Sequence, residues 1–211
     1  LFNIDPHLAN EASKAASKAM IESFMSTIFM ICAVMVACFA VTSLMRLVTE
    51  ERKNRQEQLY AMPISRYKVY ATYMIISWIL GALAQFAVVL GIYLAQANNA
   101  NAFSFAKVAA AGMSWTAGVF FILGILGLLI ALVPRLSAWI WVYLGFAFFM
   151  SYIGNRLNLP AWLNNFNIFH HISRLPVETM NWGNFVLIFA LAVSFVLLGM
   201  VAYRQRDLIG D

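Results

Sequence analysis

The chain has 211 residues, 63% of them hydrophobic and 11% charged, and a formal net charge of +5 at pH 7. A soluble domain carries about 25% charged residues, so this composition excludes a soluble globular enzyme and indicates an integral membrane protein. The positive charge is typical of basic residues in cytoplasmic loops rather than of nucleic-acid binding. Cys32 and Cys38 lie in one apolar run, which indicates buried free thiols rather than a disulfide framework.

Long apolar runs predict an all-α, polytopic transmembrane helix bundle with about five spans in a single domain, residues 1–211. Residues 1–22 are expected to form an outer loop and a helical extension, because residues 11–22 are rich in alanine and lack glycine and proline. A continuous helix from Glu11 to Val48 would be about 57 Å long, so roughly a third of it would project beyond the hydrocarbon layer. The predicted spans are residues 23–48, 67–96, 107–133, 136–153 and 182–203.

The longest connection between predicted spans, residues 154–181, is rich in aromatic side chains. It contains Trp162, Phe166 and Phe169, and Trp182 follows directly after it. Aromatic side chains favour the boundary between membrane and water. We therefore expect this outer segment to lie in the interface rather than free in water.

A charged segment separates the first two predicted spans. Nine charged residues lie between Arg46 and Lys68, with apolar runs of bilayer length on both sides, so this segment must lie in water. A short helix is predicted over residues 50–62, ended by Pro63, with Ser65 as the N-cap of the next helix. If this segment and the C-terminus are cytoplasmic, nine basic residues lie inside and five outside, which agrees with the positive-inside rule.

Residues 50–66 contain the motif E-E-x-x-x-R-x-E-x-L-x-A-x-P-x-S-R, which resembles the coupling-helix region of ABC exporter permeases. Within that group the motif is similar to the antibiotic-exporter type, described as tetronasin- or polyketide-exporter-like. Residues 169–176 and 203–208 are similar to that family's outer-loop segment and to its Arg-rich tag after the last span. The family usually has Gly at the place of Asn54, and its half begins with an amphipathic helix and a further span. These differences, with Leu1 at the start, predict a fragment that holds spans two to six of the C-terminal half.

The resemblance implies the membrane-spanning permease part of an ATP-driven exporter of lipophilic compounds, such as antibiotics or drugs, in a bacterial plasma membrane. The chain contains no G-x-x-x-x-G-K-[ST] phosphate loop, so it cannot be a phosphate-loop ATPase by itself. The resemblance implies a transport subunit rather than an enzyme. ATP and Mg are expected on a partner chain, a cytosolic ABC ATPase subunit, and no cofactor or metal is expected here. The other expected partners are the second half of the permease and membrane lipid, and no nucleic acid is expected.

The predicted contacts with the ATPase are Glu50, Glu51, Arg55, Glu57, Leu59, Ala61, Met62, Pro63, Ser65 and Arg66. In this hypothesis Leu59 and Met62 supply apolar contact inside a charged rim. The alternative is a solvated loop whose charges only fix the topology. Because topology needs only basic residues, three glutamates among them favour a surface that another protein binds.

Other polar and small residues admit a structural and a functional interpretation. His170 and His171 suit a metal site or a proton relay, but with His7 as the third histidine and no nearby cysteine, polar interface residues are favoured. Interhelical hydrogen bonds, rather than a substrate site, are expected of Ser77, Gln85, Ser114, Thr116 and Ser194. Close helix packing is expected at Gly118, Gly124 and Gly127.

Two rival functions come from other classes. An intramembrane metalloprotease of the CAAX-processing type resembles E-E-x-x-x-R followed by F-x-x-x-H, which Glu50, Glu51 and Arg55, then Phe166 and His170, fit formally. The predicted spans place the first element and the histidine on opposite faces, about 30 Å apart, too far for one catalytic site. A non-transporting membrane assembly or immunity protein that uses the charged segment only to bind a partner stays open.

Overall fold

The computed structural model consists of helices and turns, without a strand in the residues that it describes, which are 6–52, 66–97, 102–154 and 161–205. Four helical stretches are long and apolar enough to cross a membrane. They are α1 (Pro6–Arg52), α3 (Arg66–Ala95), α4 (Phe105–Met113) followed by α5 (Thr116–Leu132), and α8 (Trp182–Gln205). The prediction of an all-α membrane bundle is confirmed.

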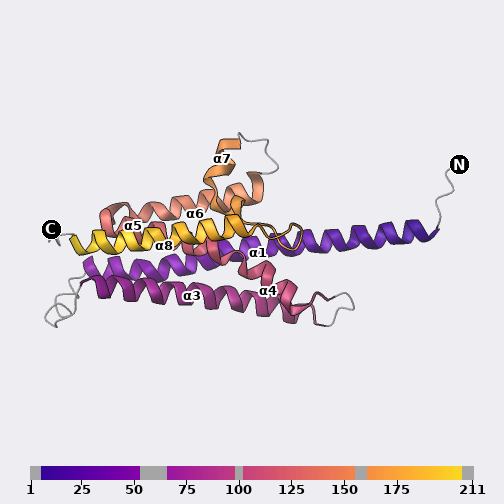
Figure 1. The fold of residues 1–211 in the computed structure, drawn as a ribbon, viewed down its shortest axis with the longest axis horizontal. Helices are drawn as coiled ribbons and strands as arrows, with labels where there is room; N and C mark the ends of the chain where they lie inside the picture. The colour runs from indigo at the N-terminus through magenta and orange to yellow at the C-terminus, as the bar shows by residue number, and fades with distance from the viewer. Residues whose placement is uncertain (1–5, 53–65, 98–101, 155–160, 206–211) are drawn as a thin grey trace.

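Helix α1 confirms the expected helix that continues beyond the bundle. Its 47 residues span about 70 Å at 1.5 Å per residue. Residues 10–21 are all exposed, and Met25 is the first buried side chain after them. In Figure 1 this N-terminal part of α1 projects well beyond the other helices. That it leaves the lipid at this point stays a prediction.

Helix α5 lies at the centre of the bundle. Of the most apolar window in residues 105–132, 67% is buried, against 22% in α3 and 17% in α8. Gly124 and Gly127 of α5 lie beside Ala192 and Gly199 of α8 in the same order, so these two helices run parallel. Helices α1 and α3 also lie side by side, in opposite directions (Figure 1).

The predicted fourth span, residues 136–153, is helical but divided into three parts. These are a 3₁₀ turn η1 (Pro134–Ala138), helix α6 (Trp139–Phe149) and a π-helical turn η2 (Met150–Gly154). Because α5 and α8 run parallel, this segment carries the chain back along the bundle. Helix α6 alone is only about 16 Å long, half of the hydrocarbon thickness, so a fifth crossing here stays a prediction.

The outer connection contains helix α7 (Ala161–Phe166) and the 3₁₀ turn η3 (Ile168–His171). Trp162 and Phe166 are exposed, as expected of an interfacial segment. Phe169 differs from these two residues, because its side chain is buried and lies against Trp115, with ring centroids 6.0 Å apart. Gly118 leaves the space that this ring occupies. That the segment lies in the interface stays a prediction.

Candidate functional site

The predicted ATPase-contact segment connects helix α1 to helix α3. Glu50 and Glu51 lie in the last turn of α1, and Arg66 begins α3. The other predicted contacts lie outside the described residues: Arg55, Glu57, Leu59, Ala61, Met62, Pro63 and Ser65. Their roles and the short helix over residues 50–62 therefore stay predictions.

The end of α1 and the start of α3 lie at the same end of the bundle as the end of α8 (Figure 1). Tyr70, near the start of α3, contacts Tyr203, near the end of α8, with ring centroids 5.2 Å apart. Both side chains are buried. The start of α3 is therefore packed firmly into the bundle, close to the predicted contact segment.

The Tyr70 hydroxyl fits into a notch made by glycines of two other helices. A Cβ on Gly127 of α5 would lie 2.5 Å from the Tyr70 hydroxyl oxygen, and one on Gly199 of α8 would lie closer still. Even an alanine at either position would collide with the phenol ring or its hydroxyl. Tyr70 therefore packs α3 closely against both α5 and α8 at this point.

Glycines hold α5 close to other elements along its length, which confirms the expectation for Gly118, Gly124 and Gly127. A Cβ on Gly118 would lie 3.1 Å from the Phe169 ring. A Cβ on Gly124 would lie 2.8 Å from the carbonyl oxygen of Ala192, which belongs to the α8 backbone. At Gly124 and Ala192, helices α5 and α8 therefore meet backbone against backbone.

The turn at residues 114–115 interrupts the helix between α4 and α5. Gln85 of α3 is buried and its side-chain amide donates a hydrogen bond of 2.9 Å to the Gly112 carbonyl, which confirms the expected interhelical bond. Ser77 is buried without a hydrogen-bond partner among the described residues. The expectation of interhelical bonds is wrong for three hydroxyls that instead donate to carbonyls three or four residues earlier: Ser114, Thr116 and Ser194. Short hydroxyl side chains reach these local carbonyls first.

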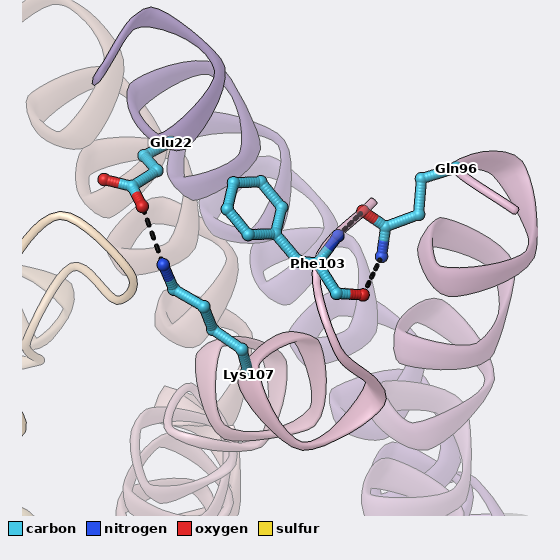
Figure 2. A network of polar contacts seen from close by, with 4 residues as sticks. All are labelled: Glu22, Gln96, Phe103 and Lys107. Carbon is cyan, nitrogen blue, oxygen red and sulfur yellow. Dashed lines mark hydrogen bonds and ion pairs between the residues drawn. The ribbon is translucent and has the colours of Figure 1, made fainter. Parts of the chain in front are cut away.

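A network of polar contacts lies at the other end of the bundle, where α1 projects beyond the other helices (Figure 2). The Lys107 ammonium lies 2.7 Å from a carboxylate oxygen of Glu22, and 4.6 Å from the centre of the Phe103 ring. The Gln96 side chain donates to the Phe103 carbonyl at 3.2 Å and accepts from its N–H at 3.1 Å. The ion pair joins α1 to α4 where α1 leaves the bundle. The two Gln96 hydrogen bonds hold Phe103, which lies just before α4.

His170 and His171 are exposed neighbours, with ring centroids 5.7 Å apart. Partial burial lowers the pKa of His170, and the nearby charges of His171 and Arg174 lower it further. Within the part of the chain that the structure describes, no group of three or more His, Cys, Asp or Glu side chains is placed to hold a metal. The geometry fits polar surface residues.

The protease hypothesis also fails on geometry. Arg174, close to His170, lines one cavity together with Met30 of α1. Glu50 follows Met30 by twenty residues of continuous helix, which is about 30 Å. A glutamate and a histidine that far apart cannot share one catalytic water.

The predictions from the sequence do not include the packing roles of two residues, Tyr70 and Asn167. Tyr70 lies within a long apolar run, without a signal of its own. Asn167 is buried and donates from its side chain to the Ser151 hydroxyl at 2.8 Å, while its side-chain oxygen accepts from the Phe169 N–H at 3.1 Å. An asparagine just before a helical turn is a recognised N-cap signal, so Asn167 was accessible to sequence reasoning.

Comparison with protein families gives one match that covers nearly the whole chain. Residues 4–204 match the family described as multidrug efflux system permease Rv1217c, C-terminal domain. The match runs from before α1 to the last turn of α8. No curated protein matches the chain.

Proposed function

The chain belongs to the family of the multidrug efflux system permease Rv1217c, C-terminal domain, and from this premise we propose that it is the membrane-spanning part of an ATP-driven exporter of lipophilic compounds. A separate cytosolic ABC ATPase supplies the energy and binds the ATP and Mg. It contacts this chain through residues 50–66. Antibiotics or drugs are the cargo, and the plasma membrane is the location.

The observation that carries the proposal is the arrangement at the charged end of the bundle. Helix α1 ends and helix α3 begins on either side of the charged segment, and Tyr70 ties the start of α3 to α5 and α8. A partner that grips this segment therefore holds two long helices at once. The mixture of glutamates with basic residues suits a protein surface better than a lipid surface, since anionic lipid attracts only the basic residues.

The mechanism follows from close packing. When two ATPase subunits close on ATP, they displace the contact segment and with it the ends of α1 and α3. The notch around Tyr70 and the backbone contact between Gly124 and Ala192 leave little room for side chains to absorb the displacement. The helices then move as rigid bodies, which is the usual way in which small shifts become large transitions. A second permease half completes the pathway.

ATP-dependent efflux in inverted membrane vesicles tests the proposal. Glu57→Arg reverses one charge in the contact segment, and we expect it to abolish efflux of a lipophilic dye while the protein still inserts in the membrane. The matched control is Glu11→Arg, the same reversal on the exposed part of α1 at the other end of the molecule.

Wild-type efflux in Glu57→Arg would contradict the coupling role. Efflux that persists without any ATPase subunit would contradict the proposal as a whole. Absence of efflux in the wild-type complex, with the ATPase bound, would favour a non-transporting assembly protein instead.

A further inference from the structure

Side chains of α5, α6 and α8, and of the segment that holds α7 and η3, line an open cavity of about 410 Å³, here called the α5–α8 cavity. Apolar side chains form most of its wall, among them Phe121 and Ile125 of α5 and Leu187 and Leu191 of α8. Small-molecule sites have volumes of roughly 300–1,000 Å³ and mostly apolar walls. The size and lining of this cavity therefore suit a small organic compound.

The α5–α8 cavity opens toward the side of the bundle. Leu187 in its wall is 58% exposed, and Phe166 of α7 is also exposed. Helix α8 is a span whose apolar window is mostly exposed, so in a membrane this face contacts lipid. A compound dissolved in the lipid reaches the cavity without passing through water.

A few polar groups are placed in this apolar wall. The Tyr143 hydroxyl donates to the Phe166 carbonyl at 3.1 Å and accepts from the Ile168 N–H at 3.2 Å, so it fixes the wall. A ring nitrogen of His171 lies 3.0 Å from the Asn165 carbonyl oxygen. Asn165 also lines the cavity and is exposed, and its side-chain amide both donates and accepts hydrogen bonds.

The charge of the lining restricts the ligand. None of the described residues that line the α5–α8 cavity is Asp, Glu, Lys or Arg. Arg174 and Glu178 line a different cavity, of about 310 Å³, beside α1. Among these described lining residues a charged ligand would find no opposite charge, which is unfavourable in apolar surroundings. The cavity therefore favours uncharged compounds over lipophilic cations.

We propose that the α5–α8 cavity binds an uncharged, mainly apolar compound with one or two hydrogen-bonding groups. The compound enters from the lipid beside α8, and its polar group meets the side-chain amide of Asn165. That this compound is the exported cargo rests on the proposed function, whereas the binding itself does not.

Photolabelling with benzophenone tests the proposal, because this compound is apolar, uncharged and carries one carbonyl acceptor. In membranes that contain the intact complex, we expect mass spectrometry to find the label on residues of the cavity wall, such as Leu187 or Phe121. Leu187→Trp or Leu191→Trp fills the cavity and should lower this labelling at least tenfold. Leu197→Trp is the matched control, since Leu197 lies on the same helix, is 55% exposed and lies outside this cavity.

Three results would overturn the proposal. One is undiminished labelling in both Leu187→Trp and Leu191→Trp. Another is equal labelling of the same residues by a benzophenone that carries a trimethylammonium group. The third is labelling by a phospholipid with benzophenone on its acyl chain but not by free benzophenone, because the cavity would then hold lipid.

Failure of this inference is distinguishable from failure of the proposed function. Glu57→Arg should lose ATP-driven efflux but keep benzophenone labelling in the cavity. Efflux that persists in Glu57→Arg contradicts the coupling role alone. Labelling that is undiminished in Leu187→Trp and Leu191→Trp contradicts the binding site alone.

Discussion

Replacing Gly124 by alanine tests the close contact between α5 and α8. The added Cβ would lie 2.8 Å from the Ala192 carbonyl oxygen and 3.3 Å from its Cα, so the backbone of one helix must move. Overpacking of this kind costs about 1–3 kcal/mol. Alanine also favours helix over glycine by up to about 1 kcal/mol, which opposes that cost and must be removed by a control.

Gly91→Ala is that control, because a Cβ on Gly91 of α3 would meet nothing within 4 Å. Both variants gain the same helical preference, so their difference isolates the collision. We expect Gly124→Ala to be less stable than Gly91→Ala by about 1–3 kcal/mol in equilibrium unfolding of the detergent-solubilised protein. Equal midpoints for the two variants would refute the backbone-to-backbone contact between α5 and α8.

Three further predictions use the same unfolding assay. Gln85→Leu removes the donor to the Gly112 carbonyl and should cost about 0.6–1.7 kcal/mol, so an unchanged midpoint would argue against this bond. A double-mutant cycle of Glu22→Gln and Lys107→Met should give a coupling of about 0.2–1 kcal/mol that disappears at high salt, whereas a salt-independent value would contradict a partly exposed ion pair. Because the pKa of folded His170 lies below its usual 6.5, the unfolded chain binds the proton more readily. The free energy of unfolding should therefore fall as the pH drops below about 6.5. His170→Gln should weaken this pH dependence, and an identical pH profile in the variant would contradict the lowered pKa of His170.

Much of the fold was predictable because lipid imposes simple rules on sequence. Apolar runs bounded by Arg66 and Gln96 and by Trp182 and Tyr203 predicted α3 and α8 to within two residues. An alanine-rich stretch without glycine or proline predicted that α1 continues beyond the bundle. Each of these signals lies within one continuous stretch of the chain, so the sequence alone is enough to detect it.

Interruptions within the apolar runs were not predictable. Ser114 and Thr116 donate their hydrogen bonds within their own turns, and the Gly112 carbonyl beside the break accepts from Gln85, almost thirty residues away. Phe169 looked like an interface aromatic because its burial depends on the space beside Gly118 in another element. Contacts between distant segments decide such features, and a linear pattern does not record them.

The predicted contact segment and the α5–α8 cavity also differ in how far the sequence predicts them. The partner contact over residues 50–66 is predicted from charge and motif alone and stays a prediction, because most of these residues lie outside the described part of the chain. The α5–α8 cavity could not be predicted, since its walls come from four separate segments of the chain, with Asn165 in α7 and His171 in η3.

Cysteine crosslinking at position 57 tests the central claim most directly. In a chain with Cys32 and Cys38 replaced by serine, Glu57→Cys should crosslink to the co-expressed ATPase subunit, and nucleotide should change the yield. A membrane-impermeant maleimide should label this cysteine in inverted vesicles but not in intact cells. Labelling from outside intact cells, with no crosslink to an ATPase, would contradict the account.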